Sequence, residues 1–420
     1  MQIEVLCTGD ELLVGLTTDT NSPYFMERLF ALGEKVARSQ TVGDVRTEII
    51  EAIKTTSARA DAVLVSGGLG PTADDLTAEC AAAAAGVPLV EHRPTLELIK
   101  ARFAKLGIAF SQNNARQALV PQGAEVVKNP VGSAPMFIQR LGRCTLFYLP
   151  GVPREYRALV DSEVLPRLSE MISLQPNRVY RASRLLKTLG LAESHLDALV
   201  APLSREHRKV TFGFRTHAPE NHLKLLAEDS SQAAADAALA SAERACREVL
   251  GAHVFGADRE SFSSAIASAM RQCGGTLAIA ESCTGGKAAD LITQEAGASD
   301  FFLGSAVTYQ DALKERWAAV DGGLLSRYGA VSREVALSMA EGIRQQTGAT
   351  YGLSITGFAG PGGGDVNNPV GTVFYAIAGF KTPECERRVL IGERERVRQF
   401  AAYAMLDFLR RRVLGLESRR

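Results

Sequence analysis

The sequence lacks an excess of either charge, a cysteine framework and any long apolar run. Lysine and arginine together number 47, as do aspartate and glutamate, so no net field draws the chain to a polyanion or a membrane surface. The seven cysteines include no C-x-x-C pair, which argues against disulfides and against zinc. Neither a run of about 18 apolar residues nor a secretory signal is recognisable. We therefore expect a cytoplasmic protein, with no membrane or nucleic-acid partner.

Histidine is also scarce, with six residues in the chain and none after His253. A Ser-His-Asp triad made within the C-terminal part is thereby excluded. The lysines after residue 260 are Lys287, Lys314 and Lys381. A serine nucleophile in this part would therefore depend on a lysine base, and that lysine must be desolvated enough to be neutral near pH 7.

The 420 residues exceed what one hydrophobic core usually organises, so two or three domains are expected. In residues 1–169, strand-like and helical segments alternate from IEVLCT to AVLVSGG, which predicts an α/β domain with a mainly parallel sheet. Residues 170–256 contain the strand candidates KVTFGF and HLKLLAE and an alanine-rich helix from about 231 to 250, which predicts a small α+β domain. The alternation restarts at Ser261, so residues 257–420 are expected to form a second α/β domain, again with a mainly parallel sheet.

A glycine-rich segment in the first domain, SGGLGPTADDLT (66–77), follows a predicted strand and opens a helix. Backbone N–H groups of such a turn can approach a phosphate at the positive helix end. The candidate binding residues are Gly67, Gly68, Gly70 and Thr72. The adjacent Asp74 and Asp75 fit this picture if a divalent cation bridges them to the phosphate. The alternative is a tight turn with an aspartate cap, but further acidic turns at 8–12, 43–44 and 149–155 favour a site at the strand ends.

Together, GDELLVG, DTN, VGD, SGGLGPTADDLT and LPGVPRE resemble the molybdopterin-binding (MoaB/MogA-like) domain. The resemblance is closer still to the N-terminal half of the CinA family, competence/damage-inducible protein A, and continues through NPVGSAP to Met136, where the family usually has glycine. It implies an ADP-ribose pyrophosphatase that depends on a divalent metal, with Asp44 and Asp75 as catalytic residues and Asp44, Asp74 and Asp75 as metal ligands. The alternative is a domain that binds a pterin nucleotide.

A second turn, AESCTGG (280–286), lies between a predicted strand and a helix in the last domain. Thr284, Gly285 and Gly286 can cradle an anion with their N–H groups, and Ser282 can present a hydroxyl. After the next predicted strand, the segment VTYQDALK places Tyr309 at the strand end and Lys314 roughly one helical turn later. Lys314 is therefore the best-placed base. The alternative is that Ser282 is a cap and Lys314 a solvated helix residue.

Three further features of this domain have two interpretations or a chemistry of their own. Cys283 is the stronger intrinsic nucleophile, but the alternation of side chains places it on the other side of the turn from Ser282, buried as a small apolar residue. The loop TGFAGPGGGD (356–365) follows the strand YGLSI and is either part of the site or a flexible connector. Arg394 in GERER is suited to bidentate phosphate binding, with a surface ion-pair network as the alternative.

The segments ESCTGG, GASDFF, VTYQDALK, ITGFAGPGGG, NPVGTV and GERERVR resemble the CinA C-terminal domain over its whole length. The resemblance implies hydrolysis of nicotinamide mononucleotide (NMN) to nicotinic acid mononucleotide and ammonia, without a cofactor. Ser282 would be the nucleophile, Lys314 its base and Tyr309 a partner in proton transfer. The implied substrate contacts are Ser299, Thr356 and Gly357, with Arg394 on the phosphate.

One position departs from the family pattern: Asp311 stands where Tyr-x-Asn-x-x-Lys usually has asparagine. A carboxylate there is expected to pair with Lys314 and favour its charged form, which weakens it as a base. The family name also suggests a non-enzymatic accessory factor of DNA uptake or recombination, but the neutral charge and the lack of a basic, aromatic-rich patch oppose direct DNA binding. As partners we expect NMN, ADP-ribose and a second copy of the chain in a homodimer.

Overall fold

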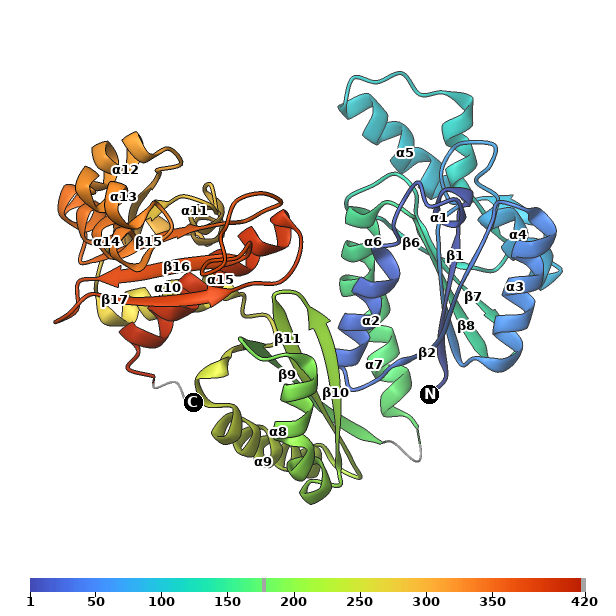
Figure 1. Ribbon diagram of the computed structural model, residues 1–420. Coiled ribbons are helices and arrows are strands. Elements are labelled where there is room, and N and C mark those ends of the chain that lie inside the picture. Colours follow the sequence, from blue (N-terminus) through green and yellow to red (C-terminus); the bar gives the residue numbers. More distant parts are fainter. Residues whose placement is uncertain (176–178, 417–420) are drawn as a thin grey trace. The chain divides into compact units, whose positions relative to one another are not determined.

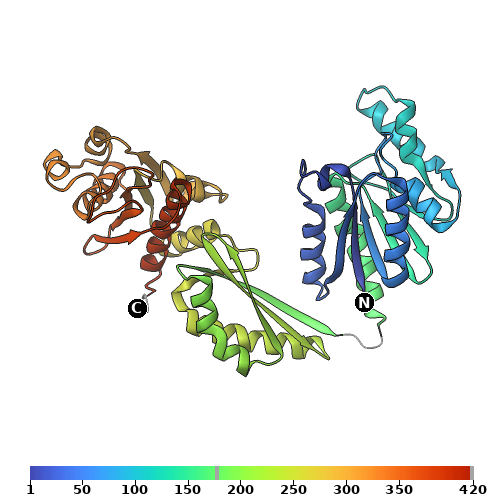
Figure 2. The same cartoon turned by 45° about the vertical axis from the view of Figure 1, so that its right-hand side comes forward.

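The computed structural model describes residues 1–175 and 179–416 of the chain. These residues form two compact units, drawn in Figures 1 and 2. The first unit comprises Met1–Ala182 with Glu228–Ala235, and the second comprises Ser183–Ala227 with Asp236–Arg420. The predicted middle domain, 170–256, thus contributes mostly to the second unit. Among the described residues, no helix has the length and apolarity needed to cross a membrane.

The first unit is built around a sheet of order β2-β1-β3-β8-β7-β6. Its strands are β1 (Ile3–Thr8), β2 (Val36–Val42), β3 (Ala62–Ser66), β6 (Glu125–Val127), β7 (Met136–Leu141) and β8 (Cys144–Leu149). The strands β2, β1, β3 and β8 are parallel, as predicted, and β7 and β6 extend them in antiparallel fashion. A separate antiparallel pair joins β4 (Leu89–Glu91) and β5 (Leu119–Pro121).

Helices cover both faces of this sheet, as Figure 2 shows. They are α1 (Asp10–Leu13), α2 (Asn21–Ala31), α3 (Arg46–Arg59), α4 (Thr77–Ala85), α5 (Arg93–Lys105), α6 (Pro153–Leu159) and α7 (Leu165–Ser173), with the 3-10 helix η1 (Gln112–Ala118) and the π-helical segment η2 (Val160–Val164). Alternation along β1 sends Val5 into the core with α2, α6 and α7, and Leu6 into the core with α3 and α4. The carboxyl ends of β1 and β3 therefore meet at one edge, where the acidic and glycine-rich turns lie.

The part of the chain between the two α/β domains forms a sheet of order β10-β11-β9-β12 with two helices on one face (Figure 1). Its elements are β9 (Tyr180–Leu189), α8 (Glu193–Glu206), β10 (Val210–His217), β11 (Glu220–Asp229), α9 (Gln232–Leu250), η3 (Gly251–His253) and β12 (Val254–Ala257). Both predicted strands and the alanine-rich helix are confirmed. The strand β9 was not predicted, because its sequence YRASRLLKTL mixes basic and apolar residues.

The C-terminal sheet has the order β14-β13-β15-β16-β17. Its strands are β13 (Leu277–Glu281), β14 (Phe302–Val307), β15 (Tyr351–Gly357), β16 (Thr372–Ala378) and β17 (Glu384–Val389). The α/β class is confirmed, but only β14, β13 and β15 are parallel, and β16 and β17 run antiparallel. The sheet is therefore mixed, since β16 returns beside β15 through the glycine-rich loop without a crossover helix.

Helices again lie on both faces of this sheet. They are α10 (Phe262–Cys273), α11 (Lys287–Thr293), α12 (Asp311–Ala318), α13 (Gly322–Tyr328), α14 (Arg333–Thr347) and α15 (Arg394–Val413), with the short turn η4 (Ala298–Asp300). Ile279 of β13 packs in the core with α10 and α15, and Ala280 packs in the core with α14. The loops that follow β13, β14 and β15 therefore share one edge of the sheet, which is the edge that carries the predicted residues.

Candidate active sites

The turn after β13 is organised by Glu281, a fully buried carboxylate at the end of the strand. Its side chain accepts hydrogen bonds from the hydroxyls of Thr284 at 2.7 Å and Ser305 at 3.0 Å. It also accepts from the backbone N–H groups of Gly286, Ala288 and Ala289, at 3.0 to 3.1 Å. A carboxylate at the N-terminus of α11 is stabilised by these bonds and by the helix dipole. Glu281 thus fixes the turn that carries Ser282.

The prediction that Thr284, Gly285 and Gly286 bind an external anion does not agree with the contacts of this turn. Glu281 takes the hydroxyl of Thr284 and the N–H of Gly286, and the N–H of Gly285 donates to the carbonyl of Ser282 at 3.2 Å. These donors already have partners within the chain. The physical reason is that the carboxylate of Glu281, the residue before Ser282, accepts the N–H groups at the start of α11 that an external anion would otherwise bind.

Ser282 itself is 8% exposed, and its N–H donates to the carbonyl of Ile355 in the neighbouring β15 at 3.0 Å. On the other side of β13, Thr308 donates its N–H to the carbonyl of Glu281 at 2.7 Å. The serine is therefore held between the end of β15 and the start of the segment that carries Tyr309 and Lys314.

Lys314 is only 2% exposed, so it is not the solvated helix residue of the alternative interpretation. Its Nζ donates to the carbonyl of Tyr309 at 3.3 Å and to Asp311 Oδ1 at 3.2 Å. The pairing with Asp311 is the one expected from the departure at that position. Within the described ranges, no hydrogen bond joins Lys314 to the hydroxyl of Ser282, although the two residues lie beyond the ends of adjacent strands.

Arg394, at the start of α15, joins two of the predicted segments. Its Nη2 donates to the hydroxyl of Tyr309 at 2.8 Å, and its Nη1 donates to the carbonyl of Gly360 in the glycine-rich loop at 2.6 Å. Both Arg394 and Tyr309 are exposed. The structure therefore brings these two residues together at the surface of the site.

One turn further along α15, Arg398 was not predicted as a functional residue. Its guanidinium donates to the carbonyls of Cys283 at 3.2 Å and Thr284 at 2.8 Å. Arg398 thus stabilises the turn that carries Ser282 through its carbonyl groups, whereas Glu281 binds the N–H groups of the same turn. The available signal was the spacing of Arg394 and Arg398, which places both on one face of a helix.

Two further predicted residues, Thr356 and Gly357, are the last two residues of β15. Thr356 is 1% exposed and its hydroxyl donates to the carbonyl of Ala330 at 2.7 Å. At Gly357 an added Cβ would lie 2.6 Å from Val373 Cγ1 and 2.7 Å from the Thr372 carbonyl oxygen. Glycine at 357 is therefore needed for the close approach of β15 to β16.

The structure does not bring Ser299 to the other residues. It lies in η4, just before β14 begins, and the neighbouring Phe301 pairs with Leu277 at the first residue of β13. Ser282 follows the last residue of β13. Because parallel strands share their amino ends, Ser299 lies at the opposite edge of the sheet from Ser282.

Cys283 is 5% exposed and belongs to the hydrophobic core of the C-terminal domain. Burial raises the pKa of its thiol to about 12, and the neighbouring carboxylate of Glu281 adds to the effect. The thiol is therefore protonated at neutral pH, in agreement with the predicted inward orientation.

In the first unit, the predicted turns surround a cavity of about 470 Å³. Its lining includes the predicted residues Gly67, Gly68, Gly70, Asp44, Asp74 and Asp75, together with Thr8, Gly9, Glu11, Asp19, Asn21, Gly151 and Glu155. The turns that follow β1, β2, β3 and β8 thus converge as the strand topology requires.

Asp44 is linked to the first acidic turn by a reciprocal pair of hydrogen bonds. Asp10 donates its N–H to Asp44 Oδ2 at 3.0 Å, and Asp44 donates its N–H to Asp10 Oδ1 at 3.1 Å. Burial raises the pKa of the Asp44 carboxyl above its usual range, and the hydrogen bond from the Asp10 N–H lowers it in part. The nearby carboxylates of Asp10, Glu11 and Asp74 raise the pKa further. A cation here would relieve the repulsion between these carboxylates.

Asp75 caps its own turn, as the alternative interpretation expected. Its Oδ2 accepts from the N–H of Thr72 at 2.8 Å and from the Thr72 hydroxyl at 2.6 Å, while it also lines the cavity. Gly67 has φ +109°, and an added Cβ would lie 2.3 Å from the carbonyl oxygen of Thr8. Only glycine allows this approach of two strand ends.

The donor set of this cavity can be tested against a divalent cation. In the described part of the chain, Asp44, Asp74 and Asp75 do not form a group of ligand atoms that all lie within 4.8 Å of one another. They therefore do not make a closed metal site alone. Carboxylates near a phosphate-binding turn fit Mg²⁺ or Mn²⁺, which is commonly held by one or two carboxylates together with substrate phosphates.

Two polar residues of this cavity were missed as site candidates. Asn21, 7% exposed, donates from Nδ2 to the carbonyl of Gly151 at 2.7 Å and to Ser66 Oγ at 3.2 Å, and its Oδ1 is buried without a partner. Glu155 accepts from Asn129 Nδ2 at 2.6 Å, and burial raises the pKa of its carboxyl. The unpartnered Asn21 oxygen is available to a ligand donor.

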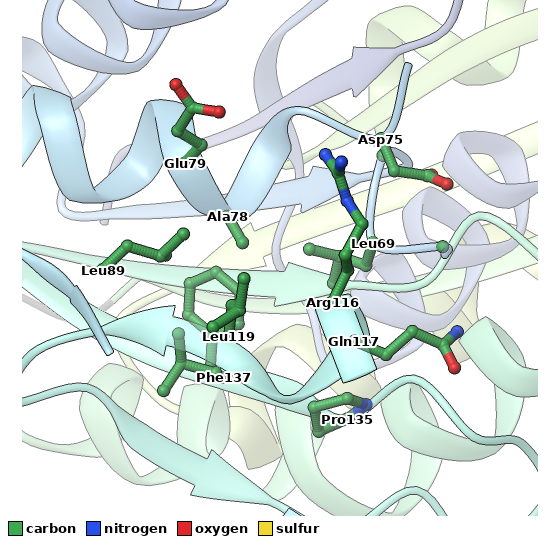
Figure 3. Close-up of a pocket in the computed structure, with 13 residues that line it drawn as sticks. Leu69, Asp75, Ala78, Glu79, Leu89, Arg116, Gln117, Leu119, Pro135 and Phe137 are labelled. Carbon is green, nitrogen blue, oxygen red and sulfur yellow. The ribbon is translucent and has the colours of Figure 1, made fainter. Parts of the chain in front are cut away.

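A second hollow of about 250 Å³ shares Gly68, Gly70 and Asp75 with this cavity. Figure 3 shows its labelled side chains, in which Phe137, Leu119 and Leu89 supply an apolar wall and Arg116 and Asp75 supply charges of opposite sign. An apolar wall of this kind can contact the apolar part of a small-molecule ligand.

Comparison with known proteins shows which protein family this chain resembles. Residues 4–170 match the probable molybdopterin binding domain, residues 183–256 the damage-inducible protein CinA KH domain, and residues 259–413 the CinA C-terminal domain. A CinA-like protein of Myxococcus xanthus is 53% identical over 99% of both chains, and one of Anaeromyxobacter sp. is 44% identical over 98% of both. The solved structure of a CinA protein of unknown function from Thermoplasma acidophilum is 34% identical, covering 39% of this chain and 96% of that chain with a TM-score of 0.37.

Proposed function

Since the chain belongs to the CinA family, we propose that its C-terminal domain is an amidase that converts NMN and water to nicotinic acid mononucleotide and ammonia. The observation that carries the proposal is the burial of Lys314, which is 2% exposed and lies beyond the end of β14, the neighbour of the strand that Ser282 follows. A buried lysine loses solvation of its charged form, which is the condition for a lysine to act as a base.

In the proposed reaction, Ser282 Oγ attacks the carboxamide carbon while neutral Lys314 takes the serine proton. The tetrahedral intermediate collapses as the nitrogen receives a proton through Lys314 and Tyr309, and ammonia leaves. Water then attacks the acyl-serine by the same route in reverse. We assign Arg394 to the phosphate, where a guanidinium can form two parallel bonds. The hydroxyl of Thr356 already donates its proton to the carbonyl of Ala330 and receives no role in this scheme. Ser299 has no role in this scheme within one chain.

The test is ammonia release from NMN by the full chain. Ser282→Ala and Lys314→Ala are expected to lose at least about 10³-fold in kcat, the scale of general-base catalysis. Lys381→Ala, which removes an exposed lysine of the same domain, serves as the matched control. Undiminished ammonia release by Lys314→Ala would contradict the Ser/Lys scheme.

For the N-terminal domain we propose metal-dependent hydrolysis of ADP-ribose to AMP and ribose 5-phosphate. The raised pKa of Asp44 among the carboxylates of Asp10, Glu11 and Asp74 supports a cation-binding role. The cation would neutralise charge on the pyrophosphate and activate the attacking water. Asp44 and Asp74 would hold it, and the Gly67–Gly70 turn would position the phosphates.

The assay is AMP formation with and without Mg²⁺ or Mn²⁺. Asp44→Asn and Asp75→Ala are expected to lose the metal-dependent activity, whereas Glu51→Gln, an exposed carboxylate on α3, is expected to keep it. A second candidate, binding of a pterin nucleotide, is favoured by the match of residues 4–170 to a probable molybdopterin binding domain. Calorimetric competition between ADP-ribose and molybdopterin distinguishes the two.

A further inference from the structure

A group of metal-binding side chains lies outside both sites, at the tip of the β10–β11 hairpin (Figure 1). His217, Glu220 and His222 each offer one ligand atom, and in the described part of the chain these atoms all lie within 4.8 Å of one another. The sequence argument against zinc considered cysteine ligands only, so it did not weigh this group.

The fold of the hairpin explains why three residues of HAPENH converge. His217 is the last residue of β10 and pairs directly with Glu220, the first of β11. Directly opposed residues of an antiparallel pair share a face, and alternation puts His222 on the same face as Glu220. Thr216, on the other face, reaches Glu193 of α8. The group therefore lies on the face of the sheet turned away from α8.

Burial and hydrogen bonding point to a ligand at this group. Glu220 is 8% exposed and His222 is 5% exposed, and Glu220 Oε2 lies 2.8 Å from His222 Nε2. Glu220 Oε2 and His222 Nε2 thus face each other in a buried position and are close enough to bind one ion together. A cation between them would neutralise the buried carboxylate, which is costly to bury as a charge without a partner.

We propose that His217, Glu220 and His222 form a binding site for a divalent transition-metal ion, of which Zn²⁺ is the best match. Two imidazoles and one carboxylate suit zinc, whereas Mg²⁺ and Ca²⁺ prefer oxygen ligands. Donor atoms about a tetrahedral zinc lie roughly 3.5 Å apart at bonds of about 2.0 to 2.2 Å, so the exposed His217 ring closes the site by a shift of little more than about 1 Å. The ion would fasten the hairpin tip and leave one coordination position for water.

The test is calorimetric titration of the chelator-treated full chain with ZnCl₂, in a background of Asp44→Asn, Asp74→Asn and Asp75→Asn that removes the N-terminal carboxylates. His217→Ala, a change at an exposed residue, is expected to weaken zinc binding by at least about 10- to 100-fold, the loss produced even by removal of an outer partner. His195→Ala removes an exposed histidine of α8 and is expected to bind zinc as the parent does.

Cobalt provides a second readout that a purely structural role would not give. The parent is expected to show the visible absorption of tetrahedral Co²⁺, and His217→Ala is expected to lose it, while MgCl₂ produces no competing heat. Superimposable zinc isotherms for the parent and His217→Ala would overturn the proposal, as would a parent that binds no zinc at micromolar concentration.

Discussion

At the scale of single residues, Glu281 organises the proposed amidase site without being proposed to react. It is fully buried and accepts five hydrogen bonds from the turn and from the neighbouring strand. Sequence reasoning used ESCTGG for its serine and glycines and gave the glutamate no role. The sequence contained a signal for this role. An acidic residue that precedes a glycine-rich turn and the start of a helix can accept hydrogen bonds from the free N–H groups of that helix.

Glu281→Gln is expected to lower the free energy of unfolding of the C-terminal domain by about 3 kcal/mol, because an amide NH₂ then faces N–H donors that have lost their acceptor. Scanning calorimetry measures the change as a lower transition temperature. Glu315→Gln alters an exposed carboxylate on α12, and a change within about 0.5 kcal/mol is expected there. Equal transitions for the two variants would contradict the role given to Glu281.

Asp311 allows a test of the proposed lysine mechanism by a substitution that is expected to raise the rate of ammonia release instead of lowering it. Its carboxylate accepts a hydrogen bond at 3.2 Å from Lys314 Nζ, the amine that the proposed reaction needs for Ser282. Asp311→Asn keeps the size of the side chain but removes this charge-assisted bond, and it is therefore expected to raise kcat/KM of the proposed amidase by a few-fold. The measurement is the rate of ammonia release from NMN, and an unchanged or lower kcat/KM would contradict the argument.

The buried thiol of Cys283 gives a further check on the nucleophile. Since its pKa is raised to about 12, the reactive thiolate is absent at pH 8 and accumulates only as the pH rises toward that value. Iodoacetamide at pH 8 is expected to leave ammonia release unchanged, and Cys283→Ala is expected to keep kcat/KM. Inactivation that is prevented by bound NMN would instead indicate a reactive cysteine in the site.

At the scale of elements, the first two turns of α15 connect separate segments of the proposed amidase site. Arg394 holds Tyr309 and the glycine-rich loop, and Arg398 holds the carbonyls of the Ser282 turn. The helix was predicted from its periodicity, but these contacts were not, since they join residues between 34 and 115 positions apart in the sequence.

Arg398→Ala is expected to lower kcat of the amidase about 10- to 100-fold with a smaller change in KM, because the turn that carries Ser282 loses two carbonyl contacts while Arg394 is retained. Arg398→Lys is expected to restore part of the rate. Arg396→Ala, which removes an arginine that lies over Phe400, is the matched control. A rise in KM at constant kcat would show that Arg398 acts on substrate binding instead.

Strand order was harder to predict than strand existence. The apolar runs of β1, β3, β13, β15 and β16 were all recognised, but apolarity does not reveal direction, so the antiparallel β16 was assigned to a parallel sheet. The edge strand β17 was missed because ECERRV is mostly charged, as edge strands often are. Ser299 was misplaced for a related reason: a residue just before a parallel strand lies at the amino edge, away from Ser282.

At the scale of the whole molecule, the division into two units predicts separable activities. The cores of the N-terminal and C-terminal sheets share no residues, so damage to one sheet leaves the other packed. The sequence already indicated two α/β domains, because the strand and helix alternation stops near residue 170 and restarts at Ser261.

Gly67→Ala is expected to abolish AMP formation from ADP-ribose and leave ammonia release from NMN intact. The added Cβ meets the Thr8 carbonyl oxygen at 2.3 Å, and the clash adds to a strain of about 1 to 3 kcal/mol from positive φ. Gly123→Ala has φ +83° but nothing within 4 Å, so it isolates the backbone strain from the clash. Parallel loss of both activities in Gly67→Ala would show that the units depend on each other.

The contacts of Glu281 also bear on how fast substrate enters. A turn held by hydrogen bonds to one buried carboxylate is already ordered before a ligand arrives, so association of NMN, the proposed substrate, carries little entropic penalty for loop closure. Such a site binds as a preformed surface, and its association rate is then governed by diffusion and by the attraction of the exposed Arg394 for the phosphate. Added salt is therefore expected to slow association more than dissociation.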